Sequence, residues 1–163
     1  MAVIDEFLRA NATYANTFSK GSLALPPARK IAAVVCMDAR IDPARALGLE
    51  EGDAHVIRNA GGRIADALRS LAISQQLLGT EAVAIVHHTD CGMLTFSDDS
   101  LRKKLRTTLS ADADHIAFLP FTDIAQSIRD DIAIYRTSAI VRQDIPVRGF
   151  IYDVKTGTLA EVE

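Results

Sequence analysis

Apolar residues along the chain fall into two patterns, continuous short runs and helical repeats. Continuous β-branched runs are typical of strands buried on both faces of a parallel sheet, and two such runs are IAAVVCM (residues 31–37) and EAVAIVHH (residues 81–88). DAHVIRN (residues 53–59) predicts a further strand, closed by a nearby Gly-Gly pair. VRGFIYDVKTG (residues 147–157) alternates in polarity and predicts an edge or outer strand before a turn.

Helical spacing recurs between these strands. It predicts a helix over residues 66–78, a short basic helix capped by Ser97 or Asp98 and ending near Leu109, and a long helix from Thr122 to about Val141. Strands separated by helices predict one α/β domain over residues 1–163, with a central, mostly parallel sheet flanked by helices.

An N-terminal helical arm is predicted over residues 1–20. Its apolar residues share one helical face, which must be buried on another surface: Ile4, Phe7, Leu8, Ala15 and Phe18. The arm has acidic residues early and lacks a basic segment followed by an unbroken apolar run, so it does not resemble a secretory signal. We therefore expect a cytoplasmic protein.

Composition narrows the function classes. A net charge of −3 gives no electrostatic basis for binding nucleic acid or an anionic membrane. With only Cys36 and Cys91, a disulfide framework is excluded, which leaves one bridge, a metal site or two unrelated thiols. No G-x-G-x-x-G follows the first strand, so dinucleotide binding is disfavoured.

Chemically active side chains gather where two predicted strands end. CMDAR places Cys36, Asp38 and Arg40 after the first strand, and HTDC places His88 and Cys91 after another. Ligand sites in open α/β sheets form at the carboxyl ends of strands, so one crevice could hold all of these residues. Two thiolates and an imidazole suit zinc, and three protein ligands leave the open position of a catalytic site.

Each of these residues also has a simpler interpretation that involves no metal site. A buried cysteine taken alone is more often a small apolar side chain, and Asp38 with Arg40 is also readable as a surface ion pair. His87 alternates with His88 and should face away from the metal, in the role of a packed histidine. Asp90 is expected to cap its turn, and His55 and His115 to be ordinary residues.

The two motifs resemble those of the β-carbonic anhydrases, C-x-D-x-R and H-x-x-C-G. The resemblance runs from about Ile31 to Asp99. It implies zinc held by Cys36, His88 and Cys91, Asp38 and Arg40 as a catalytic dyad, and an obligate dimer, or a dimer of dimers, whose cleft lies between subunits. The arm would then bury its apolar face on a neighbouring subunit.

Departures from the common pattern bear on the substrate. Ala39 replaces a serine, and His87 and Met93 replace glycines, as in a short clade that includes carbonyl sulfide hydrolases as well as anhydrases. The expected reaction is attack of zinc-bound hydroxide on a small linear molecule, carbonyl sulfide with slight preference or carbon dioxide. The RNAGG loop would contribute Ala60, Gly61 and Gly62 to the substrate pocket, because glycines allow close approach of the backbone.

Two other functions fit part of the pattern. A thiol redox protein would use Cys36 and Cys91 in a reversible disulfide but would leave His88 and the dyad without a role. A non-catalytic zinc domain would use Asp38 as a fourth ligand. An enzyme with two thiolate ligands should have a less acidic zinc-bound water than a site with three neutral histidines, so its activity should rise above neutral pH.

Overall fold

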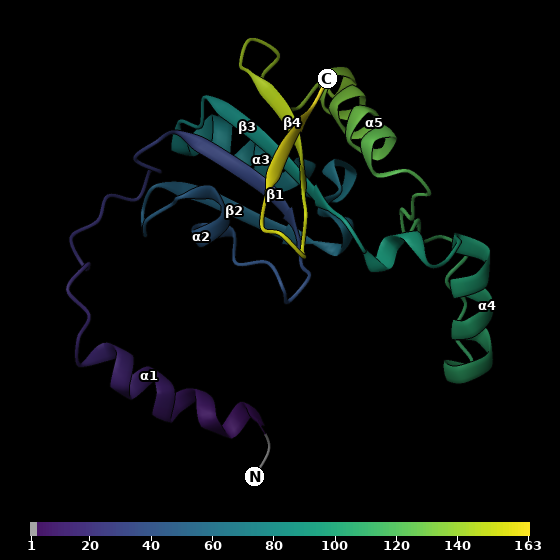
Figure 1. Ribbon diagram of the computed structural model, residues 1–163, viewed down its shortest axis with the longest axis horizontal. Helices are drawn as coiled ribbons and strands as arrows, with labels where there is room; N and C mark the ends of the chain where they lie inside the picture. Colours follow the sequence, from purple (N-terminus) through teal and green to yellow (C-terminus); the bar gives the residue numbers. More distant parts are fainter. Residues whose placement is uncertain (1–2) are drawn as a thin grey trace.

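The computed structural model describes residues 3–163, so the first two residues of the expected arm lie outside the described chain (Figure 1). Its centre is a five-stranded sheet in the order β2-β1-β3-β4-β5. The strands are β1 (Ile31–Cys36), β2 (Ala54–Asn59), β3 (Ala82–His88), β4 (Val147–Tyr152) and β5 (Leu159–Val162). Every neighbouring pair is parallel except β4 with β5. The prediction of a mostly parallel sheet is therefore confirmed.

Helices precede or connect the strands, and some of them pack against the sheet. They are α1 (Phe7–Ala15), α2 (Pro43–Leu47), α3 (Ile64–Leu78), α4 (Asp98–Leu109) and α5 (Ile124–Thr137), with 3-10 turns η1 (Val3–Glu6), η2 (Ala60–Gly62) and η3 (Gly92–Leu94). Ser97 caps α4 as predicted, by accepting a hydrogen bond from the backbone N–H of Ser100. α5 ends earlier than predicted. The backbone becomes extended at Ser138, and Val141 beyond it packs into the core.

The core has two parts, one on each face of the sheet. Alternate residues of β1 divide between them, because side chains of a strand point to opposite faces. Ala32 and Val34 join the part that α3 and α5 cover, which also contains Ile64, Leu71, Ile85 and Tyr135. Ala33 and Val35 join the other part, which also contains Cys36, Val86, Cys91, Met93 and Phe121. The second part adjoins the ends of β1 and β3 that carry the chemical motifs.

Two elements differ from the prediction. β4 is an interior strand rather than an edge, because β5 pairs with its outer side. β5 is short and largely exposed, so its four residues carry no periodic signal. α2 was also not predicted, although its signals are readable in retrospect: Asp42 caps it, proline begins it and Gly48 ends it in the left-handed region.

The N-terminal arm is helical but lies apart from the sheet (Figure 1). Its apolar side chains are exposed within the described chain, with Phe7 at 61% and Leu8 at 82% of their full accessible surface. None of the helices within residues 3–163 has both the length and the apolar content that a bilayer-spanning segment requires.

Candidate metal centre

Three predicted ligands meet where β1 and β3 end side by side. Cys36 is the last residue of β1, His88 is the last residue of β3, and Cys91 follows a two-residue turn. Their ligand atoms, two Sγ and an imidazole nitrogen, all lie within 4.8 Å of one another, and all three residues are buried. The fold thus brings residues of two motifs that are distant in sequence into one compact set of soft donors.

His88 is oriented for coordination. Its Nδ1 lies 2.8 Å from the carbonyl oxygen of Thr89, so Nδ1–H donates to that carbonyl and leaves the lone pair on Nε2. Nε2 is buried and has no hydrogen-bond partner among residues 3–163. A buried polar atom without a partner is costly, and a zinc ion bound at Nε2 would remove that cost. The donor set therefore fits zinc.

The two thiols are coupled. A hydrogen bond from the Cys91 thiol lowers the pKa of Cys36 to about 4, and His88 lowers it further against the effect of burial. The same hydrogen bond, together with burial, raises the pKa of Cys91. Burial lowers the pKa of His88, but the nearby thiolate of Cys36 outweighs it and raises that pKa overall. The site favours a thiolate, the form of cysteine that binds metals.

Asp38 is held beside the three ligands by Arg40. The guanidinium grips the carboxylate at both oxygens, with Nε 3.0 Å from Oδ1 and Nη2 2.8 Å from Oδ2. Hydrogen bonds from the Arg40 side chain and backbone hold the pKa of Asp38 well below its usual range. Asp38 Oδ2 lies 3.8 Å from His88 Nε2. The carboxylate is thus ionised and adjacent to the ligand set while bound to arginine.

Asp90 completes a clamp on Arg40. Its Oδ2 accepts from Arg40 Nη1 at 2.7 Å, and its carbonyl oxygen accepts from Nη2 at 2.9 Å. Its φ of 56° lies in the left-handed region, which aspartate tolerates better than most residues. The sequence indicated a turn-capping role for Asp90. The contact with Arg40 was missed, because fifty residues separate the two and only the parallel pairing of β1 and β3 joins them.

Arg58 is a second residue that sequence reasoning missed. From β2 it donates to the carbonyl oxygen of Cys36 through Nε and Nη2, at 3.1 and 2.9 Å, and to the carbonyl of Asp38 at 2.7 Å. These bonds fix the backbone where β1 ends. An arginine one residue before the end of an adjacent strand is the only sequence signal for this role.

A cavity of about 310 Å³ opens beside the ligands. Its lining is mainly apolar and consists of Cys36, Met37, Asp38, Ala60, Gly61, Cys91, Gly92, Met93 and Phe96. Ala60 and Gly61, two of the predicted pocket residues, lie in this wall. Gly62 does not; it packs behind the wall, where a Cβ would come within 3.0 Å of both the Cys36 nitrogen and the Val86 oxygen.

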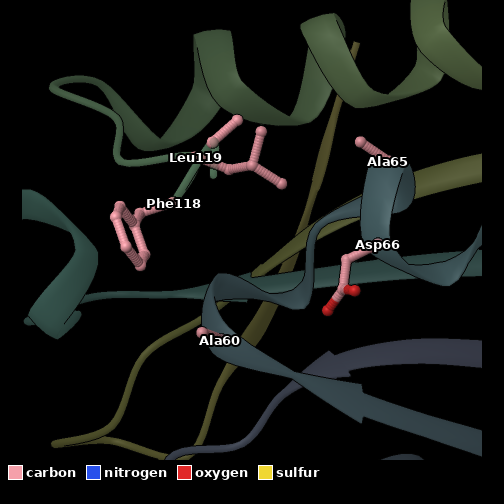
Figure 2. A pocket seen from close by; sticks show the side chains of 6 residues that line it. Ala60, Ala65, Asp66, Phe118 and Leu119 are labelled. Atoms are coloured by element: carbon pink, nitrogen blue, oxygen red, sulfur yellow. The ribbon is translucent and has the colours of Figure 1, made fainter. Parts of the chain in front are cut away.

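A larger cavity of about 440 Å³ shares Ala60 with the first. Figure 2 shows Phe118 and Leu119, from the loop before α5, on one side of it, and the carboxylate of Asp66 on another. The remaining lining residues, Ala65 and Ala117, are small. The candidate metal centre therefore adjoins a wider, largely apolar hollow.

The other histidines lie away from the three ligands. His87 faces α5, where its Nδ1 lies 2.7 Å from Ser127 Oγ and its Nε2 lies 3.1 Å from Asp131 Oδ2. This matches the prediction that it points away from His88. His55 contacts Ser74 at 2.7 Å, and His115 is exposed.

Comparisons with known proteins agree with this geometry. The sequence profile of the carbonic anhydrase family matches residues 31–119. Beta-carbonic anhydrase 1 of Mycobacterium tuberculosis is 44% identical over 99% of each chain. A carbon disulfide hydrolase of an Acidianus species is 31% identical, over 96% of this chain and 87% of the relative.

Solved structures share the fold. The crystal structure of carbonic anhydrase from Streptococcus mutans covers 100% of this chain and 99% of its own, with a TM-score of 0.95 and 46% identity. An apo form of carbon disulfide hydrolase covers 98% of this chain and 90% of its own, with a TM-score of 0.72 and 25% identity. The chain belongs to the β-carbonic anhydrase family of zinc enzymes.

Proposed function

We propose that this enzyme hydrates carbon dioxide to bicarbonate, with Cys36, His88 and Cys91 holding the zinc ion. The observation that carries the proposal is that an imidazole nitrogen of His88 lies within 4.8 Å of two thiol sulfurs, while the buried Nε2 lacks a hydrogen-bond partner among residues 3–163. Three ligands leave a coordination position for a reactant. Held by these three residues, zinc would act as a Lewis acid that lowers the pKa of water and so makes hydroxide available for attack on the substrate carbon.

Asp38 and Arg40 have separate tasks in this proposal. Asp38 accepts a hydrogen bond from the attacking water and so directs an oxygen lone pair toward the substrate. Arg40 occupies both carboxylate oxygens, at 3.0 and 2.8 Å, and thereby restrains Asp38 from becoming a fourth metal ligand. Because its pKa is held well below the usual range, Asp38 stays ionised throughout the working pH range.

The cavity suits a small linear substrate. Met37, Met93 and Phe96 form its apolar surface, which favours an uncharged molecule over water. The sequence alone favoured carbonyl sulfide slightly. We now place carbon dioxide first, because the relatives named as carbonic anhydrases are 44% identical, compared with 31% for a carbon disulfide hydrolase.

Carbonyl sulfide hydrolysis, giving carbon dioxide and hydrogen sulfide, is the second candidate. Sulfur is larger than oxygen and a weaker hydrogen-bond acceptor, so it gains more from apolar surroundings. Met93 supplies such surroundings at the wall of the cavity. The full-length likeness to a carbon disulfide hydrolase also supports chemistry on sulfur-containing substrates.

We also propose that the working form is a homodimer. Phe7 and Leu8 are exposed on an arm that lies apart from the sheet (Figure 1). A second subunit would bury these side chains.

The experiment is a side-by-side assay of purified protein on carbon dioxide and carbonyl sulfide, from pH 6 to pH 9 (roughly the range over which a metal-bound water titrates), with zinc measured in the same samples. We expect carbon dioxide hydration that rises above neutral pH. Since Asp38 is already ionised, the rise reports the attacking water. Zinc-loaded protein that turns over neither substrate would refute the proposal.

Asp38→Ala separates catalysis from metal binding in the same assay. We expect it to lose at least about 100-fold in kcat/KM while retaining zinc. Asp99→Ala is the matched control, because Asp99 is an almost fully exposed carboxylate on α4 whose ion pair is with Arg102 of the same helix. Loss of zinc from Asp38→Ala would instead indicate that Asp38 is a structural ligand.

A further inference from the structure

A buried polar network lies behind the wall of the metal cavity and outside the ligand set. It consists of Arg63, Asp131, His87 and Ser127, and is called here the Arg63 network. Arg63 Nη2 lies 3.2 Å from Asp131 Oδ1, and Asp131 Oδ2 lies 3.1 Å from His87 Nε2. Asp131 and His87 have no exposed surface, and Arg63 has 7%. None of its members is a predicted metal ligand or part of the Asp38–Arg40 pair, so the proposed reaction leaves it without a role.

Stability alone does not account for this network. Burying an ion pair removes both charges from water, and uncharged replacements of similar size are often as stable or more stable. The Arg63–Asp131 contact also lacks hydrogen-bond geometry, and Arg63 Nε has no partner among residues 3–163. A charged pair that is incompletely satisfied indicates a role in holding particular segments in place.

The network holds three segments that border the cavity. Arg63 follows Gly61 by two residues, and the side chain of Asn59 fixes the Arg63 backbone through bonds of 2.8 and 2.7 Å. His87 directly precedes the ligand His88 on β3. Asp131 joins the two segments from α5.

Phe121 connects the Arg63 network to the third segment, which contains Met93. Its ring stacks on His87 with centroids 5.4 Å apart, and the Arg63 guanidinium lies 5.5 Å from the ring centroid. Its backbone N–H donates to the carbonyl oxygen of Met93 at 3.2 Å. Met93 and Gly61 both line the cavity, and a Cβ on Gly61 would come within 3.0 Å of Met93 Cγ. A shift of this network would therefore move both the Gly61 part and the Met93 part of the cavity wall.

We infer that Arg63 and Asp131 are positioning residues that fix the Ala60–Gly61 wall relative to His88 and Met93. They thereby set the width of the cavity beside the metal ligands. The effect on turnover rests on the proposed function, whereas the effect on cavity width does not. Since displacement of a small substrate by about 1 Å can cost up to about 100-fold in rate, control of this width is a direct control of catalysis.

The test compares Arg63→Met, Asp131→Asn and the double variant. Arg63→Met leaves the buried Asp131 with His87 but without its cation, and Asp131→Asn leaves the Arg63 guanidinium without its carboxylate. We therefore expect both single variants to unfold at lower temperature than the parent. The double variant removes both charges and should regain most of the lost thermal stability. We expect it to retain zinc while kcat/KM stays at least about tenfold below the parent. A purely structural network predicts that activity returns together with stability.

Thiocyanate binding provides a readout that does not depend on turnover. Thiocyanate is a small linear anion, and its dissociation constant can be measured from the visible spectrum of cobalt-substituted protein. We expect the dissociation constant of thiocyanate to be at least about fivefold larger in the double variant, the equivalent of about 1 kcal/mol of binding free energy. Arg142→Met with Asp144→Asn is the matched control, because this ion pair is partly exposed and lies on the loop before β4. It should leave both readouts unchanged.

The outcomes separate the two proposals. A parent protein that hydrates neither carbon dioxide nor carbonyl sulfide defeats the proposed function, while thiocyanate binding still tests the positioning role. A double variant with parental thiocyanate affinity and parental kcat/KM overturns the positioning role, whatever its stability. Arg63→Lys keeps the cation beside Asp131 and is the milder variant if Arg63→Met fails to fold. It should retain more activity than the double variant, and failure to do so would also count against the inference.

Discussion

At the scale of single residues, the central feature is that one arginine serves two carboxylates. Arg40 holds Asp38 through two side-chain contacts and is itself held by Asp90 through a carboxylate and a carbonyl oxygen. Asp90 lies between two of the metal-ligand candidates in sequence, so its clamp links their turn to the dyad. Because Arg40 is held by both Asp38 and Asp90, its side-chain conformational entropy is lost when the protein folds and not during the reaction. Arg40 therefore presents Asp38 in a defined orientation.

Asp90→Asn tests this clamp. Asparagine tolerates the left-handed backbone at this position and keeps the carbonyl contact, so only the charge is removed. We expect kcat/KM to fall roughly threefold to tenfold, the equivalent of about 1 kcal/mol, with zinc content unchanged. Asp99→Asn, a change at an almost fully exposed carboxylate, should have no effect. Parental kcat/KM in Asp90→Asn would show that the clamp is dispensable.

At the scale of elements, the turn η2 is fixed by how closely it approaches two strands. Gly62 has a φ of 69°, and a Cβ there would lie 3.0 Å from backbone atoms of both β1 and β3. Backbone atoms of interior strands cannot move aside as a flexible side chain can. The close approach brings Ala60 and Gly61 to the cavity wall, which explains why this glycine matters although it does not line the cavity.

Gly62→Ala and Gly48→Ala form a matched pair. Both glycines have a positive φ, 69° and 62°, but a Cβ on Gly48 would meet nothing within 4 Å. We expect Gly48→Ala to lower the free energy of unfolding by about 1–2 kcal/mol from backbone strain. Gly62→Ala should lower it by a further 1–3 kcal/mol or so, because the added methyl group also meets fixed backbone. Urea unfolding of the two variants measures the difference, and equal losses would contradict the close approach.

At the scale of the whole molecule, the N-terminal arm has an apolar face that the described chain leaves exposed. Phe7 and Leu8 are exposed apolar side chains at the start of α1. The larger apolar cavity, lined by Phe118 and Leu119, is also accessible on the body of the molecule (Figure 2). Both features fit a molecule that completes its apolar packing by association with another copy.

Phe7→Glu with Leu8→Glu should convert a dimer to monomers. Each of these side chains contributes about 1.5–3 kcal/mol when buried, so their loss should weaken the dimer Kd by more than about tenfold. Sedimentation velocity over a range of concentrations measures the change. Thr13→Glu is the control, since it adds charge to the opposite face of the same helix. A double variant that sediments as the parent does would contradict the proposed dimer.

Much of the fold follows from sequence patterns alone. The continuous apolar runs at residues 31–37 and 81–88 determined two central strands, and helical spacing determined α3, α4 and α5 to within a few residues. Pairing of strands is a non-local property, so the interior place of β4 could not be read from its alternating residues. β5 contributes only four largely exposed residues, which carry too little periodicity to be recognised.

The candidate site was also predictable only in part. The sequence alone predicts the chemical set of Cys36, His88 and Cys91, with Asp38 and Arg40, because spacing within CMDAR and HTDC is local. Only the tertiary structure decided the contacts that position it. The parallel pairing of β1 with β3 brings Asp90 to Arg40, and the packing of α5 brings Asp131 to Arg63 and His87. The physical reason is that donor chemistry belongs to residue type, whereas distance between segments far apart in the chain is set by how strands and helices pack.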